Sequence, residues 1–234
     1  MTRGALYGLG VGPGDPELLT LKAWRLLRTV PVVAYLAPDQ GASFARSVVA
    51  AWLSPVQIEI AIRVPMVSAR PPAQAIYDRA AAEVAGHLDA GRDVAVLCQG
   101  DPLFYGSFVQ LYKRLSPAYA TTLVPGVSSL TACAAAAGFP LAVRDETLTV
   151  LPATLSEAEL KRRLAHTEAA AIIKLGRHFP KVRRMLDQVS LTVHARYVEH
   201  ASLATERHLA LDAVDPATVP YFSMILVRRP RDET

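Results

Sequence analysis

The order of apolar and polar positions predicts two successive α/β segments. In the first half of the chain, short continuous apolar runs, typical of buried strands, alternate with longer stretches of helical periodicity. The expected strands cover residues 5–11, 30–36, 56–62, 94–98 and 121–124, and the expected helices cover 16–28, 43–53, 73–90 and 107–115. Because this order is β-α-β-α with continuously apolar strands, it predicts a parallel sheet covered by helices on both faces.

The second half has a different pattern. Its expected strands cover residues 147–151, 170–175, 193–199, 207–211 and 222–227, and its expected helices cover 156–165 and 179–189. Five strands with only two helices predict a separate α/β domain with a mixed sheet. A chain of 234 residues suits two small domains. We place the N-terminal domain at residues 1–126 and the C-terminal domain at 127–234.

Composition and charge narrow the classes of protein. The chain is 51% hydrophobic and has a net charge of +4, which suits a folded, mildly basic protein. No dense Lys/Arg block precedes the tail at 228–231, so we expect neither a nucleic-acid nor a membrane partner. The N-terminus lacks the order of a signal peptide, so the cytoplasm is the expected location. Cys98 and Cys133 lie in apolar runs and are expected to be buried free thiols.

Three loops built from Gly, Pro and small polar residues follow three first-half strands. They are GLGVGPGDP at 8–16, QGDPLFYG at 99–106 and PGVSS at 125–129. In an open parallel sheet, ligands bind outside the carboxyl ends of the strands, so the loops predict one ligand site. A dinucleotide fingerprint fails because Pro13 replaces its third glycine, and the P-loop ending is absent. The ligand is therefore expected to be neither NAD nor ATP.

Two aspartates in these loops have a simpler explanation. Asp15 and Asp101 each precede a proline and an expected helix, which is the pattern of an N-cap followed by proline at the first helical position. Capping alone would explain either residue. The recurrence of the pattern on one sheet edge favours a ligand site, and both interpretations stay open at this point.

The same loops carry a resemblance to a known family. GLGVGPGDPELLTLKA resembles the opening signature of the tetrapyrrole methylase superfamily, CQGDPLFYGSF its second signature and VPGVSSL its third loop. The match continues through 173–176, 197–201 and 221–223. Most members have Gly-Gly-Asp-Pro in the second loop, where this chain has Gln99 in place of the first glycine. With the Phe-Tyr-Gly-Ser-Phe run and residues 144–146, the chain looks most like the branch that methylates precorrin-2 at C20 in cobalamin biosynthesis, giving precorrin-3A.

The resemblance implies that S-adenosylmethionine binds in a cleft between the two domains and leaves as S-adenosylhomocysteine. Transferred by motif, the cofactor-binding residues would be Pro13 in the floor, Gly100 and Asp101 near the amino acid portion or ribose, Phe104 beside them, Ser128 and Ser129 as polar contacts, and Leu175 and Ala201 near the adenine. Small loops with backbone donors and apolar walls suit such a ligand. The resemblance also implies a homodimer.

Methyl transfer from a sulfonium mainly requires orientation and a dry site, so no metal is expected. The tetrapyrrole substrate carries acetate and propionate groups, whose natural partners are arginines. The candidates in or near loops are Arg63, Arg70 and Arg144, although each is equally explained as a solvated surface residue. A base must accept the proton lost after methylation, and Tyr35, Glu146 and Glu199 are candidates among which the sequence does not choose.

Other functions stay open. The substrate could be the cobalt-bearing counterpart, another carbon of a corrin precursor, uroporphyrinogen III or a protein side chain. In a different class, the chain would be a non-catalytic module that binds the cofactor or an anion. Product formation separates an enzyme from such a module.

Overall fold

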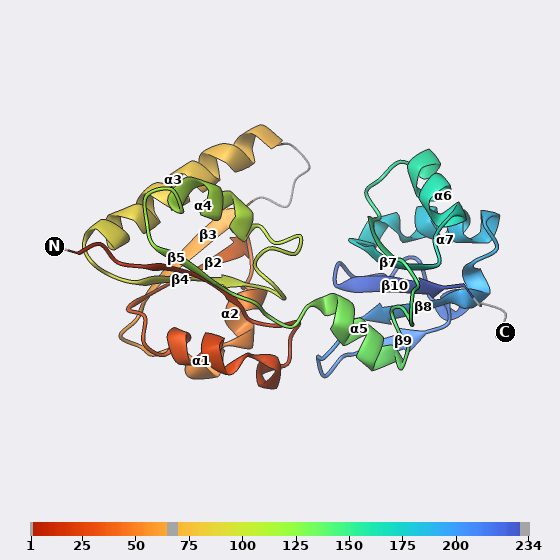
Figure 1. Cartoon of the computed structure of the whole chain (residues 1–234), viewed down its shortest axis with the longest axis horizontal. Helices are drawn as coiled ribbons and strands as arrows, with labels where there is room; N and C mark the ends of the chain where they lie inside the picture. Colours follow the sequence, from red (N-terminus) through yellow and green to blue (C-terminus); the bar gives the residue numbers. More distant parts are fainter. Residues whose placement is uncertain (1, 65–69, 230–234) are drawn as a thin grey trace. The chain divides into compact units, whose positions relative to one another are not determined.

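The computed structural model describes residues 2–64 and 70–229, of which 70–73 contribute backbone only. The chain forms two compact units, Met1–Ser128 (unit 1) and Ser129–Thr234 (unit 2). The division predicted from the sequence lies between residues 126 and 127. Each unit has its own sheet and its own helices (Figure 1).

The sheet of unit 1 is entirely parallel. Its strands, in order across the sheet, are β3 (Ile58–Val64), β2 (Val32–Pro38), β4 (Val94–Cys98), β1 (Leu6–Gly10) and β5 (Thr121–Val124). Every neighbouring pair is parallel. All five strands therefore end at the same edge, where β1 lies between β4 and β5.

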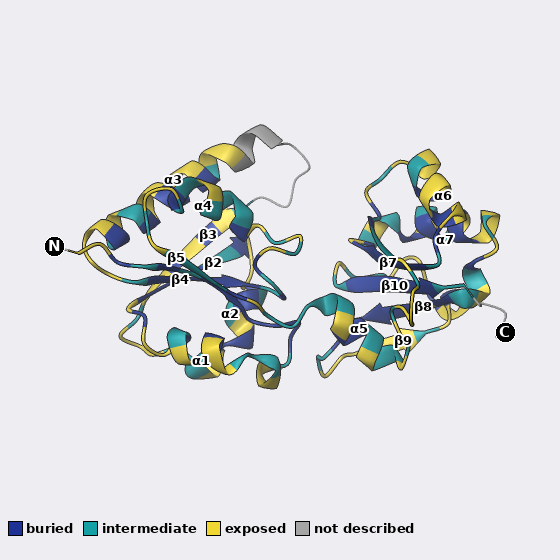
Figure 2. Cartoon of the chain, viewed as in Figure 1, coloured by how far each residue is buried: buried dark blue, intermediate teal, exposed yellow. Residues whose placement is uncertain are grey.

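Helices cover both faces of this sheet because successive side chains of a strand point to opposite faces. The helices of unit 1 are α1 (Leu21–Leu27), α2 (Phe44–Val48), α3 (Arg70–Asp89) and α4 (Phe108–Leu115), with short 3₁₀ turns η1 (Pro16–Leu18) and η2 (Ala50–Trp52). Val94 and Val96 of β4 pack with α3 and α4, whereas Ala95 and Leu97 pack with α1 and α2. Figure 2 shows buried central strands between helices whose outer surfaces are exposed, whereas the edge strand β3 is partly exposed.

The helix expected over 16–28 forms two separate pieces. Asp15 caps η1 by accepting a hydrogen bond from Glu17 N at 2.8 Å. Thr20 then caps α1, since its hydroxyl accepts from Ala23 N at 3.2 Å. A hydroxyl that bonds to the main chain in this way competes with helix continuation, which explains the break.

The sheet of unit 2 is mixed. Its strands, in order, are β6 (Leu148–Pro152), β7 (Ala169–Ile173), β10 (Ser223–Arg228), β8 (Ala195–Glu199) and β9 (Arg207–Leu209). β6 and β7 are parallel, whereas β10 is antiparallel to β7 and β8, and β9 is antiparallel to β8. Because β7 and β8 both oppose β10, they end at the same edge, on either side of the start of β10.

Three longer helices cover the two faces of this sheet. They are α5 (Ser129–Ala137), α6 (Glu157–Ala165) and α7 (Phe179–Gln188), and a 3₁₀ turn lies at each of η3 (Gly176–His178), η4 (Thr192–His194) and η5 (Leu211–Ala213). α6 and α7 pack on one face of the sheet, and α5 packs on the other. The expectation of only two helices was wrong. An alanine-rich stretch has no polar face to produce a helical pattern, although alanine has the highest helix propensity.

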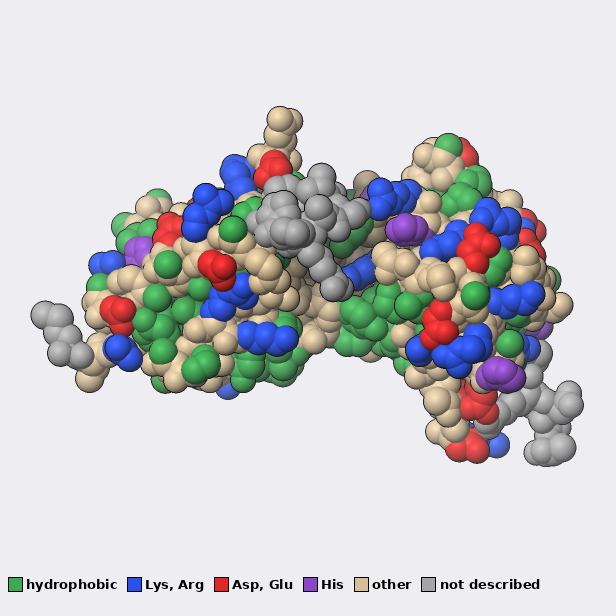
Figure 3. All heavy atoms as spheres, turned by 90° about the horizontal axis from the view of Figure 1, so that it is seen from above, with side chains coloured by type: hydrophobic (Ala, Val, Ile, Leu, Met, Phe, Trp, Pro, Cys, Tyr) green, Lys and Arg blue, Asp and Glu red, His purple; other side chains and the backbone are tan. Residues whose placement is uncertain are grey.

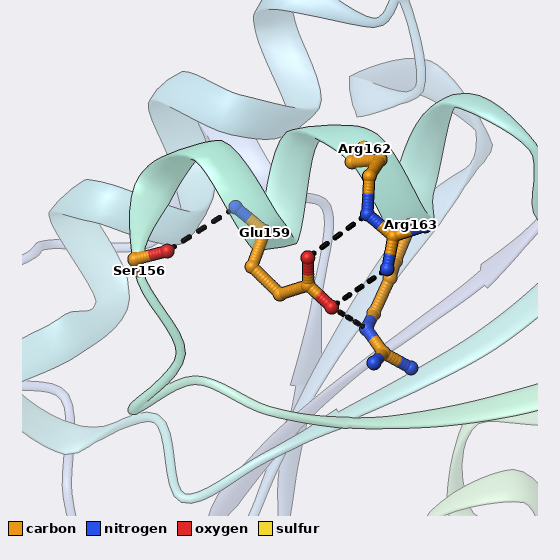
Figure 4. A network of polar contacts seen from close by, with 4 residues as sticks. All are labelled: Ser156, Glu159, Arg162 and Arg163. Atoms are coloured by element: carbon orange, nitrogen blue, oxygen red, sulfur yellow. Dashed lines mark hydrogen bonds and ion pairs between the residues drawn. The ribbon is translucent and has the colours of Figure 1, made fainter.

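The start of α6 shows how local chemistry fixes a helix end. The Ser156 hydroxyl accepts a hydrogen bond from Glu159 N at 3.3 Å, which is half of a capping box (Figure 4). The Glu159 carboxylate pairs with Arg162 and Arg163 at 2.8 and 2.5 Å. Hydrogen bonds from these two guanidinium groups hold the pKa of Glu159 down to about 2.

The predicted fold class is confirmed, since a parallel α/β unit is followed by an α/β unit with a mixed sheet. Cys98 and Cys133 are buried free thiols, as expected. Within the described ranges, no helix has both the length and the apolar character needed to cross a membrane.

Candidate functional site

The loops after β1 and β4 are joined by their main chains at the carboxyl edge of the parallel sheet. Gly100 N donates to Gly12 O at 2.8 Å, and Gly12 N donates to Gly100 O at 3.3 Å. Val11 N also donates to Cys98 O at 2.9 Å. Gly12 and Gly100 have φ values of 81° and 64°, a left-handed conformation that glycine adopts without steric cost. These two loops therefore behave as one backbone unit.

The loop after β5 packs against both of them with no room for a side chain. A Cβ atom on Gly126 would lie 2.1 Å from Gly100 O and 2.7 Å from Gly10 Cα. A Cβ atom on Gly10 would lie 2.5 Å from Gly126 N. Gly126 does not have a positive φ. The requirement for glycine at this position comes from close main-chain approach, not from its backbone conformation.

Asp101 links the second loop to the third. Its Oδ1 accepts a hydrogen bond from Leu103 N at 2.9 Å, and its Oδ2 accepts one from Gly126 N at 3.2 Å. No helix begins at Pro102, because α4 starts only at Phe108. The N-cap interpretation of Asp101 was therefore wrong, whereas that of Asp15 is confirmed. Asp101 instead closes a local turn and holds the neighbouring loop.

The remaining predicted cofactor residues of unit 1 lie around this junction. Pro13 and Gly100 are buried, and Ser128 is half-buried at the end of the third loop. The Phe104 ring contacts the ring of Tyr105 edge to face, with centroids 5.0 Å apart. Tyr105 is 48% exposed and has a φ of 55°, so the second loop ends in a strained turn with an accessible aromatic ring. Ser129 is the first residue of α5 and belongs to unit 2.

The charge of the three loops is negative although the protein is basic. Residues 8–16, 99–106 and 125–129 contain Asp15 and Asp101 but no Lys or Arg. Fixed carboxylates of this kind favour a cationic ligand group and repel an anionic one. The edge formed by β4, β1 and β5 therefore suits a sulfonium or an ammonium better than a phosphate or a polycarboxylate.

The edge of unit 2 where β7 and β8 end has a repeated backbone feature. Lys174 directly follows β7 with a φ of 58°, and His200 directly follows β8 with a φ of 52°. His200 N donates to Phe222 O at 2.9 Å, which joins the end of β8 to the segment before β10. Leu175 and Ala201 come next, with 0% and 8% exposure. Because their side chains are buried, a ligand would meet mainly their main chain.

The described residues contain no group of three or more His, Cys, Asp or Glu side chains that could hold a metal ion. On the face drawn in Figure 3, Lys and Arg side chains lie among Asp and Glu side chains, with no continuous basic stripe.

Comparison with known proteins agrees with this geometry. The family model described as "Tetrapyrrole (Corrin/Porphyrin) Methylases" matches residues 5–214, which include the three loops and most of unit 2. The chain belongs to this family. The cobalamin biosynthesis protein CobIJ of Mycobacterium bovis is 44% identical over 233 residues, covering 96% of this chain and 46% of that protein. The chain thus spans about half the length of the CobIJ relatives it matches.

Two further proteins are similar to this chain along nearly the whole length of both sequences. The precorrin-2 C(20)-methyltransferase of a Sinorhizobium species is 42% identical over 232 residues, covering 96% of this chain and 95% of that protein. Among solved structures, uroporphyrin-III C-methyltransferase from Thermus thermophilus, complexed with S-adenosylhomocysteine, has a TM-score of 0.68 and 27% identity, covering 96% of this chain and 97% of that one.

Two of the three candidate bases lie in the interior of structural hydrogen-bond networks. Tyr35 lies in the middle of β2, where burial and a hydrogen bond with Glu59 raise its pKa. The Glu146 side chain is only 3% exposed, and its carboxylate pairs with Arg228 Nε at 2.8 Å. It also accepts a hydrogen bond from Val143 N at 2.8 Å, so it closes the turn before β6. Both side chains have contacts that explain them without catalysis.

Glu199, the third candidate, is buried at the end of β8. Its Oε2 accepts a hydrogen bond from the Tyr197 hydroxyl at 2.5 Å, and its Oε1 pairs with Arg207 at 3.2 Å. Burial and this carboxylate together raise the pKa of Tyr197. The structure therefore singles out none of the three, and a catalytic base stays a prediction.

The three predicted substrate arginines have different surroundings. Arg63 lies near the end of β3, and its Nη1 donates to Pro38 O and Asp39 O at 3.0 and 3.2 Å. Arg144 is exposed in the turn before β6, with a φ of 54°. Arg70 is the first residue of α3, and its side chain lies outside the described residues.

The glycine-rich loops were predicted from the sequence, but the close packing of Gly10 against Gly126 was not. The only signal in the sequence is that each glycine lies at or just beyond the end of a strand. A glycine there indicates close approach of main chain or of a ligand, and the sequence cannot distinguish the two.

Proposed function

We propose that this chain transfers a methyl group from S-adenosylmethionine to C20 of precorrin-2, giving precorrin-3A. The observation that carries the proposal is the 42% identity, over nearly the full length of both chains, with a protein named precorrin-2 C(20)-methyltransferase. The cofactor part is supported by the related methyltransferase structure that contains S-adenosylhomocysteine. It is also supported by the acidic loop edge, which suits a sulfonium cation.

The residues of unit 1 fit this cofactor by their chemistry. Asp15 and Asp101 give the edge its negative charge, and the buried Pro13 and Gly100 provide a rigid main-chain surface. When bound, S-adenosylmethionine supplies a methyl group that its sulfonium has already activated. The protein then has to supply orientation, because an aligned reacting pair about 3 to 3.5 Å apart gains most of the available rate advantage. The doubly bonded glycine bridge and the Asp101 link give these loops the rigidity that orientation requires.

Binding and turnover test the two parts separately. Calorimetry should show that the purified protein binds S-adenosylmethionine and S-adenosylhomocysteine. Incubation with labelled S-adenosylmethionine and a tetrapyrrole panel should label precorrin-2. A preference for the cobalt-bearing counterpart or for uroporphyrinogen III would correct the substrate. Cofactor binding without transfer to any tetrapyrrole would favour a binding module, and absence of cofactor binding would refute the proposal.

We also propose that the protein is a homodimer, as the family resemblance implies and as is commonest among soluble oligomers. Light scattering at micromolar concentration should return about twice the chain mass of 25.2 kDa. A value equal to the mass of one chain would refute the dimer without affecting the proposed reaction.

A further inference from the structure

Arg63 lies at the carboxyl end of the parallel strands, as the three loops do, but on the other side of the sheet from β5. It is the last residue but one of β3, the outer strand on the side away from β5. Ile60 and Ile62 point into the core beneath α3 and α4. Because side chains alternate along a strand, Arg63 points to the opposite face, where it is exposed.

The Arg63 guanidinium is hydrogen-bonded through Nη1, whereas its Nε and Nη2 are available to a ligand. Its Nη1 donates to the carbonyl oxygens of Pro38 and Asp39, at 3.0 and 3.2 Å. A guanidinium has five N–H groups, and these two bonds occupy only one of its three nitrogens. In the part of the chain that the structure describes, Arg63 has no carboxylate partner, whereas Arg46 and Arg114 of the same unit pair with Glu59 and Asp78.

The position of Arg63 along the edge matches the size of the proposed substrate. Neighbouring strands lie about 4.8 Å apart, so the end of β3 is roughly 10 Å from that of β4 and roughly 14 Å from that of β1. A macrocycle of four pyrrole rings, with its reacting carbon near the loops, extends its carboxylate side chains over a span of this order. The loops themselves carry Asp15 and Asp101 and repel carboxylates, so these groups must be bound elsewhere.

From this separation of charge along one sheet edge, we infer that Arg63 binds a peripheral carboxylate of the tetrapyrrole through Nε and Nη2. The inference rests on the proposed function and adds a substrate subsite to it. The two backbone carbonyls fix the guanidinium before the substrate arrives, so less side-chain freedom is lost on binding. Hydrogen bonds to charged groups contribute about 10-fold to 100-fold in affinity.

The test compares Arg63→Ala and Arg63→Lys with the wild type. For Arg63→Ala, the KM for precorrin-2 should rise about 10-fold to 100-fold, whereas kcat and the Kd for S-adenosylhomocysteine stay within about 3-fold of wild type. Arg63→Lys keeps the positive charge but loses the planar guanidinium, so its KM should lie between those of the wild type and Arg63→Ala. Added salt should raise the wild-type KM more than that of Arg63→Ala. Arg28→Ala is the matched control, because Arg28 is exposed and stacks on Trp24 at the far end of α1.

A structural role for Arg63 would give different results. If Arg63 only stabilises the loop after β2 through its hydrogen bonds, Arg63→Ala should lower the melting temperature and weaken cofactor and substrate binding together. That outcome, or an unchanged KM for precorrin-2 in an active Arg63→Ala protein, overturns the inference and leaves the proposed reaction intact. If the wild-type protein labels no tetrapyrrole, the proposed function fails and the inference fails with it.

Discussion

Replacing Gly126 with alanine should uncouple the three loops while leaving the fold of unit 1 in place. The added Cβ atom would lie 2.1 Å from Gly100 O, where an ordinary contact needs at least 3.4 Å. The two main chains must therefore separate by about 1.3 Å, and the Gly126 N to Asp101 Oδ2 bond, already 3.2 Å, must stretch or break. A misplacement of about 1 Å costs on the order of 100-fold in rate, and overpacking costs about 1–3 kcal/mol of stability.

Urea denaturation, calorimetry with S-adenosylhomocysteine and steady-state kinetics measure the three consequences. Gly126→Ala should remain folded, bind the cofactor product at least 10-fold more weakly and turn over about 100-fold more slowly. Gly126→Val should be worse, because its two γ-carbons need still more room. Gly86→Ala is the control. Gly86 lies in α3 with open space around its Cβ position, so alanine should stabilise the protein by up to about 1 kcal/mol. A folded Gly126→Ala protein with wild-type binding and turnover would refute the packing argument.

Three further substitutions test individual polar contacts. Asp101 accepts hydrogen bonds from Leu103 N and Gly126 N, and Asp101→Asn would present an amide NH₂ to one of these two donors. Asp101→Asn should therefore weaken cofactor binding nearly as much as Asp101→Ala, which removes both bonds; calorimetry showing wild-type affinity would contradict this. Arg228→Ala removes the ion-pair partner of the Glu146 carboxylate, which keeps its hydrogen bond from Val143 N, and should cost about 1.5–3 kcal/mol in urea denaturation; a loss below about 0.5 kcal/mol would contradict this. Arg46 holds the pKa of Glu59 below its usual value. The pair therefore stabilises the fold at any pH above the usual pKa of a glutamate, and this stabilisation is lost as the pH falls through the lowered pKa. Glu59→Gln should remove less than about 1 kcal/mol at pH 7 and flatten this acid dependence.

The sequence predicted the sheets better than the helices. Each predicted strand appears within about two residues of its expected bounds, because continuous apolar runs are a strong signal for buried strands. The strand expected over 170–175 ends at Ile173 because Lys174 adopts a positive φ, which the sequence of a lysine does not indicate. α5 was missed because its alanines give no amphipathic pattern.

The candidate site could be located from the sequence, but the roles within it could not. Glycine and proline after parallel strands correctly indicated that the loops meet at one edge. The pairing of Asp101 with Gly126, 25 positions apart, depends on tertiary packing that no local pattern contains. The arginines could not be ranked either, because the anchoring of Arg63 by two carbonyls of another strand and its loop is visible only in the fold.

The position of the transferred methyl group tests the central claim most directly. The protein is incubated with precorrin-2 and S-adenosylmethionine carrying a carbon-13 methyl group, and the labelled carbon is then located in the product by NMR. If the proposed reaction is right, one new methyl signal appears, attached to C20. A label on any other ring carbon, or no labelled tetrapyrrole from a protein that binds the cofactor, would contradict it.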